Sequence, residues 1–267
     1  MDYVEQKTLT GVVLGVGCPV ESKTEGKSMC AICVGDSGLF RLYPIPGDRK
    51  LPVWSQIDAK VTKGNDNRDE SWKMKSHSIV GNVSDRAEKK AILDRCTLRS
   101  GDQDPVTFQN ERKKSILIVK PMSLGGEIEP QRAKVDSDWV HTQKMSWSKP
   151  LAGWTSLQGG AHKSHIVARE AYETIRRKPH EPFSYFTNIR IGNPDWDHWL
   201  VMGNLKNRRN VWVVVNIHRQ KKTGDLFIPH FSNLISGRPD GWPYSEQQGG
   251  NALVAEGQLL MSTMQDT

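Results

Sequence analysis

Residues 29–46 read MCAICVGDSGLFRLYPIP, and this stretch decides the fold class. It is apolar, contains β-branched residues and is interrupted by glycines, a pattern typical of strands. Its central residues 35–38 (GDSG) predict the tight turn of a β-hairpin. Residues 9–20 (LTGVVLGVGCPV) have the same character and predict another strand. The N-terminal part of the chain is therefore predicted to be a small barrel over about residues 1–85.

Further strands are predicted wherever short apolar runs lie between turn-forming residues. These strands are predicted over residues 57–63, 78–83, 115–120, 183–191, 199–205, 211–219 and 226–229.

Two segments predict helices. Asp85 is a plausible N-cap for a short helix that continues to residue 95, with Glu88 placed for a capping box. Residues 162–178 form the second predicted helix, because Val167, Ala171 and Ile175 recur at four-residue spacing. On that helix the basic and histidine side chains would form a stripe roughly opposite the apolar face, and these are His162, His165, Arg169 and Arg176.

The predicted fold is mainly β, of the β-rich α+β class, with two small OB-like barrels joined by a helix and long loops. An N-terminal OB-like domain is expected over 1–125, followed by an irregular connector with tryptophans over 126–160. A basic helix and a second β domain are expected over 161–235. Residues 236–267 are rich in glycine and polar residues, which predicts a partly mobile tail.

Composition limits the possible environments. No apolar run approaches the ~18 residues of a membrane span, and the first ten residues do not resemble a signal peptide. The four cysteines do not suggest a disulfide scaffold in a chain of 267 residues. A soluble protein of the reducing cytoplasm, with no membrane partner, is therefore expected.

Positive charge is concentrated in one part of the chain. From Val140 to Lys222 there are 14 Lys and Arg against 5 Asp and Glu, a balance of +9, whereas the remainder has 23 against 25, a balance of −2. A localised positive field attracts polyanions, chiefly nucleic acid. A surface that only aids solubility is the alternative explanation.

Three short motifs occur in a recognisable order, namely residues 41–46 (RLYPIP), 66–73 (DNRDESWK) and 115–121 (SILIVKP). Together they resemble a family of prokaryotic proteins that is similar to dual OB-like domain proteins. The resemblance is good over about residues 10–125 and loose beyond, through 183–186 (FSYF). It implies two OB-like domains and a mobile-element or phage-defence context, without a defined chemistry. Relatives often have cysteine and histidine in the C-terminal half, but no cysteine follows Cys96 here.

Several residue groups could form catalytic or metal sites. Cys30 and Cys33 form a C-x-x-C pair, but a structural zinc ion needs four ligands, and neither Cys18 nor Cys96 has a close partner. The C-x-x-C pair lies in a predicted strand, where positions i and i+3 face opposite sides, so small core residues are the favoured interpretation.

The remaining candidates are acidic or histidine groups. Asp66 and Glu70 could hold a metal ion in a nuclease, although a surface ion-pair network with Arg68 and Lys73, or a loop that orders against the adjacent strand, is favoured. Residues 111–113 (ERK) resemble the E-x-K of some nucleases, with Asp104 nearby, but that motif belongs within a strand. His162, His165 and His198, with Asp195 and Asp197, could be ligands or acid–base groups, yet the neighbouring arginines favour phosphate binding. No catalytic residue, metal ligand or cofactor is therefore predicted.

Basic residues interleaved with aromatics give the strongest functional signal. OB barrels bind single strands by stacking bases on aromatic side chains while Lys and Arg contact phosphates. Tyr185 is a further stacking candidate, and Trp212 is predicted to be core. The predicted nucleic-acid-binding residues are Lys163, Arg169, Arg176, Arg177, Arg190, Trp196, Trp199, Arg208, Arg209, Lys221 and Lys222.

The function predicted from sequence is binding of single-stranded or structured RNA or DNA within a larger prokaryotic complex, with protein partners. One alternative is a metal-dependent nuclease. Another is a non-catalytic assembly adaptor, in which tryptophans bury against a protein partner and basic residues aid solubility.

Overall fold

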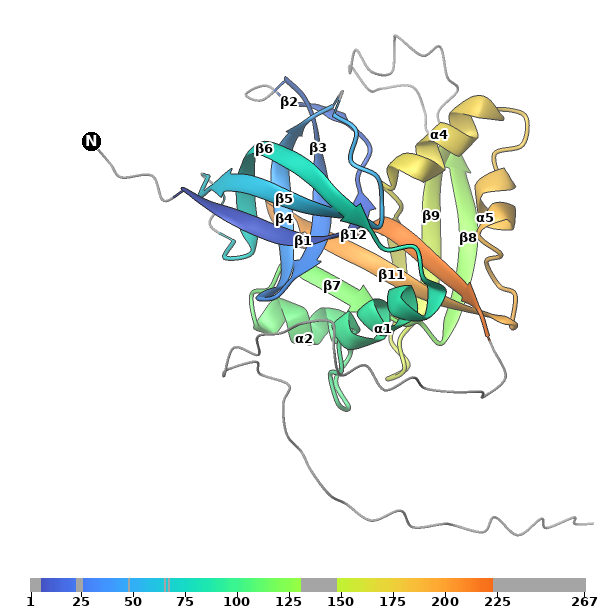
Figure 1. The fold of residues 1–267 in the computed structure, drawn as a ribbon. Helices are drawn as coiled ribbons and strands as arrows, with labels where there is room; N and C mark the ends of the chain where they lie inside the picture. Colours follow the sequence, from blue (N-terminus) through green and yellow to red (C-terminus); the bar gives the residue numbers. More distant parts are fainter. Residues whose placement is uncertain are drawn as a thin grey trace, which may run out of the picture. The chain divides into compact units, whose positions relative to one another are not determined.

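The structure is a computed structural model that describes residues 6–22, 26–47, 49–64, 66, 68–130 and 148–222 (Figure 1). All the described helices and strands belong to one compact unit, Met1–Leu226. The described chain is mainly β, as predicted. None of its described helices is long and apolar enough to cross a membrane. The predicted strand over 226–229 and the predicted tail over 236–267 lie outside the described residues.

The N-terminal strands close into a barrel. The first strand pairs with both the second and the fourth long strands, and the third pairs in parallel with the fifth, which is the arrangement of an OB fold. The predicted hairpin is confirmed, with its turn at Asp36 and Ser37. The strands are β1 (Gln6–Val16), β2 (Val20–Ser22), β3 (Gly26–Gly35), β4 (Gly38–Pro46), β5 (Ser55–Thr62) and β6 (Ser71–Asn82), of which β2 is a short edge strand.

A second barrel has the same connectivity. Its first strand is bent into two pieces, β7 and β8, which pair with β11 and β9 respectively. The third and fifth strands, β10 and β12, meet through a parallel bridge between Ile166 and Val214. The strands are β7 (Ile116–Val119), β8 (Ser123–Pro130), β9 (Ser148–Thr155), β10 (Ala161–His165), β11 (Trp196–Leu205) and β12 (Arg208–Lys221). The strand order of each half thus supports the predicted pair of OB-like barrels.

Helices occupy two places in this plan. Along the chain, α1 (Arg86–Cys96) and α2 (Pro105–Glu111) come after the strands of the first barrel and before those of the second. The Asp85 side chain caps α1 by accepting from the Glu88 amide, as predicted. In the second barrel, α4 (Arg169–Arg177) and α5 (Ser184–Asn188) connect the third strand to the fourth and lie beside β8 and β9 (Figure 1). Their buried side chains, including Ala171, Tyr185 and Phe186, complete the core of the second barrel.

The predicted helix over 162–178 is correct only from Arg169. The preceding residues form β10, so His162 and His165 do not lie on a helical face with Arg169 and Arg176. Residues 161–166 alternate in exposure, with Ser164 and Ile166 buried. The strand period was hidden in the sequence because a serine and a histidine occupy positions on its inner face.

Two further predictions were wrong. Residues 183–191, predicted as a strand, contain α5 instead, and the buried residues Tyr185, Phe186 and Ile189 follow helical spacing. The predicted irregular connector over 126–160 contains most of β8 and all of β9. In β8, Leu124 and Ile128 pack toward the core, but the glycines of this strand interrupt the apolar alternation in the sequence.

A shared core joins the barrels. Leu14, Ile32 and Val34 of the first barrel pack in one cluster with apolar residues of β7, β11 and β12, and with Leu93 of α1. Every residue of β7 is buried, and so are seven consecutive residues of β12. Strands buried on both faces read as continuous apolar runs, which explains the sequence ILIV and the run around VWVVV.

His218 lies within this contact between the barrels. Its Nε2 atom is 2.6 Å from the carbonyl oxygen of Leu14, and its ring centroid is 4.6 Å from that of Trp54. Burial lowers the pKa of His218 to about 4, and burial lowers that of His165, on β10, to about 4 as well. Both imidazoles are therefore neutral in the folded protein at pH 7.

We expect acid to destabilise the fold through these histidines. An unfolded histidine takes up a proton near pH 6.5, whereas the folded imidazoles resist protonation down to about pH 4. The unfolded chain therefore binds more protons in this window, and stability falls as the pH decreases from about 6.5 to 4. Thermal unfolding followed by circular dichroism across this range measures the slope. His218→Asn should flatten it, whereas exposed His180→Asn should leave it unchanged; equal slopes in all three proteins would contradict the assignment.

Candidate nucleic-acid interface

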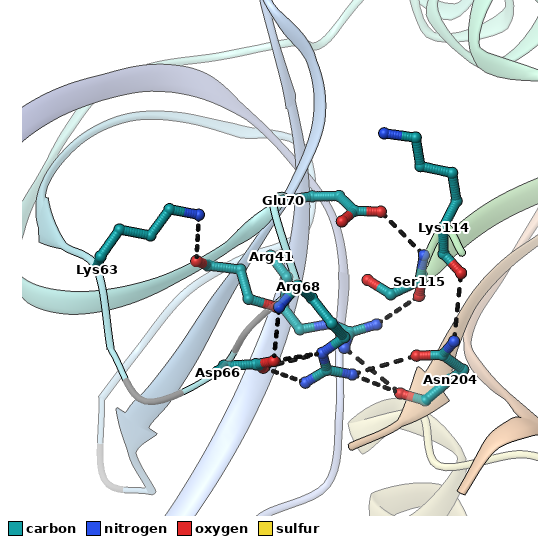
Figure 2. Close-up of polar contacts among 9 residues, drawn as sticks. Arg41, Lys63, Asp66, Arg68, Glu70, Lys114, Ser115 and Asn204 are labelled. Atoms are coloured by element: carbon teal, nitrogen blue, oxygen red, sulfur yellow. Dashed lines mark hydrogen bonds and ion pairs between the residues drawn. The ribbon is translucent and has the colours of Figure 1, made fainter. Parts of the chain in front are cut away.

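The three sequence motifs meet in one buried polar network between the barrels (Figure 2). From the RLYPIP segment, Arg41 donates to the carbonyl oxygens of Ser115 at 2.6 Å and Asn204 at 3.4 Å. The amide of Ser115 in turn donates to Glu70 Oε1 at 2.9 Å. Burial and the nearby charge of Arg68 lower the pKa of Arg41 to about 10, so its guanidinium stays charged at neutral pH. A cation on β4 is thus held against the backbone of the second barrel.

Arg68 makes the other half of the network. It forms a bidentate ion pair with Asp66 and donates to the carbonyl oxygen of Asn204 at 2.9 Å and to the Asn204 Oδ1 atom at 3.2 Å. Burial favours protonation of Asp66, but the hydrogen bonds and charge of Arg68 outweigh it and hold the pKa of Asp66 below its ordinary value. The loop does contain the expected ion pairing, but Arg68 is buried against the second barrel and Asp66 is mostly buried beside it, rather than on the surface, where the network was predicted.

Asn204 ties two basic turns together. Its Nδ2 atom donates to the carbonyl oxygen of Lys114 at 3.3 Å and to that of Arg209 at 3.0 Å. Lys114 lies in the segment between α2 and β7, and Arg209 lies just after the β11–β12 turn. In Figure 2 the Lys114 side chain points away from the buried network. One amide therefore holds two cation-bearing turns next to each other at the contact between the barrels.

We call the resulting surface the basic junction. All its members are exposed except Lys114 and Arg209, which are half-buried. Glu111, at the end of α2 directly before the first turn, accepts a hydrogen bond from Gln103. Lys113 adopts a left-handed backbone conformation, with φ 55°, at the tip of its turn. The basic junction consists of Arg112, Lys113, Lys114, Lys206, Arg208 and Arg209.

The loops involved are those that OB folds use for ligands. The turn of residues 206–207 joins the fourth and fifth strands of the second barrel, and residues 63–70 join the fourth and fifth strands of the first. Loops at this position contact oligonucleotides and oligosaccharides in OB folds. Arg68 of one loop contacts Asn204 beside the other, so the two loops meet at the junction.

A second group of predicted residues lies at the other end of the β11–β12 hairpin. Trp196 pairs in register with Lys221, and the guanidinium of Arg219 lies 5.5 Å from the Trp196 ring centroid. The Lys222 amide donates to the carbonyl oxygen of Asp195. Ten residues of β11 at about 3.3 Å each separate this end from the junction by roughly 30 Å. The two groups are therefore distinct surfaces rather than one compact site.

The remaining predicted basic residues are dispersed and mostly paired. Lys163 on β10 forms an ion pair with Glu127 at 2.8 Å. Arg176 and Arg177 of α4 both contact Glu173. Arg169 donates to the carbonyl oxygen of Arg49, and Arg190 is exposed after α5. A cation that already pairs with a carboxylate contributes less binding energy to a phosphate contact than an unpaired cation does.

Two predicted stacking residues are core residues instead. Trp199 is 0% exposed and belongs to the cluster shared by the barrels, where its Nε1 atom donates to Asp94 Oδ1 at 3.0 Å. Tyr185 is 1% exposed and packs in the second barrel. Trp212 is buried, as predicted, and Trp154 is buried too. Trp139 and Trp147 lie outside the described residues. Trp196, half-buried, is the predicted stacking residue that can still offer part of its ring.

The histidine group does not form a site. His162 lies 2.7 Å from Asp104 and stacks on Trp154, whereas His165 bonds Tyr172 and His198 bonds the carbonyl oxygen of Ile189. Each imidazole therefore has its own partner. Among the described residues, no three His, Cys, Asp or Glu side chains converge in a way that could hold a metal ion.

The nuclease-like and cysteine motifs have structural places. Glu111 ends α2, and Asp104 caps the start of that helix, so neither lies in a strand as the E-x-K arrangement requires. Cys33 is buried in the core of the first barrel, whereas Cys30 is half-buried near Gly17 on the other face of β3. Both cysteines are free.

Sequence reasoning found two of the six junction residues, Arg208 and Arg209. It missed Lys206 and the cations of the 112–114 turn, since that turn lies outside the segment with the largest charge excess. The sequence ERKK directly before a buried strand could have indicated this basic turn. Such a turn next to another OB loop strengthens the positive potential of that loop.

No family model matches the chain, and no curated protein matches it. Among solved structures, the tetrameric p202 HIN2 aligns with 11% identity and a TM-score of 0.28, over 84% of this chain and 96% of that one. A murine DNA-binding protein bound with double-stranded DNA aligns with 13% identity and a TM-score of 0.30, over 84% of this chain and all of that one. At such scores these similarities assign neither a family nor a function, and the description of the fold rests on the strand order of the chain itself.

Proposed function

We propose that this protein binds nucleic acid through the phosphate backbone, and that the basic junction is its principal contact surface. The observation that carries the proposal is the convergence of six cationic side chains on two adjacent turns at the meeting point of two OB loops. Lysine and arginine side chains neutralise phosphates and release counterions, which supplies most non-specific affinity for nucleic acid.

The buried network supports this proposal because it fixes the turns that carry the cations. Asn204 fixes both turns, so the cations are presented on a rigid support. Arg41, 4% exposed beneath the surface, bonds carbonyl oxygens, and Asp66 is already paired with Arg68. The carboxylates of Asp66 and Glu70 offset the buried charges of Arg41 and Arg68, so the exposed cations of the junction supply its positive potential.

Trp196 supplies a second, aromatic contact in this proposal. Its half-buried ring lies beneath Arg219 and beside Lys221. An aromatic side chain next to cations can stack a base while the cations contact phosphates, worth on the order of 1–3 kcal/mol per base. A strand that reached both ends of the hairpin would have to cover roughly 30 Å, by the strand length given above.

The proposal predicts a large effect of charge reversal at the junction. Lys113→Glu with Arg208→Glu should weaken binding of a fluorescent oligonucleotide by about 30-fold or more and reduce the slope of log K against log salt by roughly 1.5 to 2. Fluorescence polarisation with single-stranded and duplex DNA and RNA, at two salt concentrations, measures both. The matched control, Lys149→Glu with Lys178→Glu, makes the same charge change at lysines paired with Glu129 and Glu181. An equal loss in the control would contradict a localised site.

The same experiment distinguishes the alternatives. Samples incubated with Mg²⁺ and run on a denaturing gel would reveal cleavage, and Mg²⁺-dependent cleavage would move the assignment to a nuclease. Absence of binding to every polymer at low salt would instead favour the assembly adaptor, within the defence or mobile-element complex that the motif resemblance implies.

A further inference from the structure

One sheet face of the first barrel has charge and chemistry that the junction does not use. In β1, β5 and β6 the inward side chains fill the core, among them Ile57, Ala59 and Val61, all 0% exposed. The alternate residues therefore face outward. The register places Thr8, Lys60 and Ser76 in one row across the three strands, and a bulge next to that row adds Lys75.

The outward row is basic and rich in hydroxyl groups. Lys60, Lys75, Thr8 and Ser76 are all exposed, and in the described part of the chain neither lysine has an ionic partner. The acidic neighbour on this face is Asp58, which accepts a hydrogen bond from Thr10 at 2.6 Å. Cations flanked by small hydroxyl donors suit phosphate oxygens, because both donate hydrogen bonds to them.

The loop that follows this face reaches the residues beneath the basic junction. Lys63 directly follows β5, the fourth strand of the barrel, and donates to the carbonyl oxygens of Asp69 and Ser71, near the start of the fifth. The intervening loop carries Arg68, which bonds Asn204 beneath the junction. The same end of the barrel holds Lys7, whose ammonium lies 3.8 Å from the ring centroid of Trp72, with that of Lys63 at 4.1 Å. The exposed Lys63 therefore lies between the loop that carries Arg68 and the outward row of the sheet.

We infer that the outward face of β1, β5 and β6, centred on Lys60 and Lys75, is a second phosphate-contacting surface, onto which a nucleic acid held at the junction extends. This inference rests on the proposed function. It further predicts that the bound polymer is long enough to contact both surfaces. The row offers cations and hydroxyls and no aromatic side chain, so its contact is with the backbone and independent of base sequence. An OB fold covers about 4–16 nucleotides, so only a longer strand would reach both surfaces.

The test compares two lengths of single-stranded DNA on the full chain. Fluorescein-labelled oligonucleotides of about 8 and about 24 nucleotides fall within and beyond the site of one barrel. Lys60→Glu with Lys75→Glu should weaken binding of the longer oligonucleotide by about tenfold and lower its salt slope by roughly 1.4, with the shorter one changed by less than about twofold. The matched control is again Lys149→Glu with Lys178→Glu, which should affect neither length.

The outcomes separate this inference from the proposed function. If the wild-type protein binds both lengths and the Lys60/Lys75 variant binds both as the wild type does, the second surface is refuted and the junction stands. If the wild type binds neither length, both proposals are overturned. Binding of the wild type, but not of this variant, to vesicles containing phosphatidylserine, with unchanged oligonucleotide binding, would reassign the face to an anionic membrane surface.

Discussion

Arg68→Ala should destabilise the protein by about 3–5 kcal/mol, because it breaks a buried ion pair and leaves its partner uncompensated. The guanidinium is 4% exposed and the Asp66 side chain 11% exposed. Without Arg68, Asp66 keeps its burial penalty and loses the interactions that hold its pKa down. The Asn204 carbonyl oxygen also loses its closer donor. In a protein of this size, the melting temperature should fall by on the order of 10 °C.

A double variant identifies the cause of that loss. Asp66→Ala added to Arg68→Ala removes the unpaired carboxylate, so part of the stability should return. Exposed Arg208→Ala serves as the control and should change the melting temperature by little. Differential scanning calorimetry of the four proteins measures these differences. A single variant as stable as the wild type would show that the network does not hold the barrels together.

The motif residues show which contacts a local sequence pattern can predict and which it cannot. The charged loop around Asp66 was predicted to be a surface ion-pair network; Asp66 and Arg68 do pair, but they are largely buried at the contact between the barrels. Its partners, Ser115 and Asn204, are far away in the sequence, and no local period connects them to Arg68. Gly203 is part of the same arrangement, since a Cβ at that position would lie 2.6 Å from Arg41 Nη2. Such contacts depend on how two barrels pack, which a single sequence does not encode locally.

The strands were predictable where the alternation of residues was clear. The hairpin of β3 and β4 and the long run of β12 were expected from sequence, whereas β8, β9 and β10 were missed. In the missed strands, glycine, serine or histidine takes inward positions, so the apolar period is broken although the backbone is extended. Their pairing partners complete the sheets, and tertiary packing decides the conformation.

The chemistry of the candidate site was predictable from the sequence, but its position in the fold was less predictable. The surplus of cations directed attention to the C-terminal half, yet that surplus includes residues paired with Glu173 or Glu127. The turn at 112–114 and the lysines of β5 and β6 lie outside that half. Net charge per segment cannot distinguish paired from unpaired cations, because pairing is a property of the folded surface.

Trp199→Ala should be about as damaging to stability as the loss of Arg68, and for a different reason. The ring is 0% exposed in the cluster shared by both barrels and α1, so its removal leaves a large cavity. Replacing a buried tryptophan with alanine typically costs about 3–5 kcal/mol. The hydrogen bond from Nε1 to Asp94 is lost too, but that carboxylate is 40% exposed and can bond water instead. Cavity formation therefore dominates, and chemical denaturation of the purified variant measures it.

A conservative variant separates core packing from a direct role in binding. Trp199→Phe keeps most of the ring volume, so the protein should fold, and its oligonucleotide affinity should match the wild type within about twofold. Trp196→Ala should do the opposite, leaving the melting temperature nearly unchanged while weakening binding by the 1–3 kcal/mol of a lost stack, about 5- to 150-fold. If the folded Trp199→Phe protein lost affinity and Trp196→Ala did not, base stacking would have to be reassigned from the exposed end of the hairpin to the core tryptophan. Because Trp199 is buried in the core shared by both barrels, such a result would require the two barrels to separate on binding.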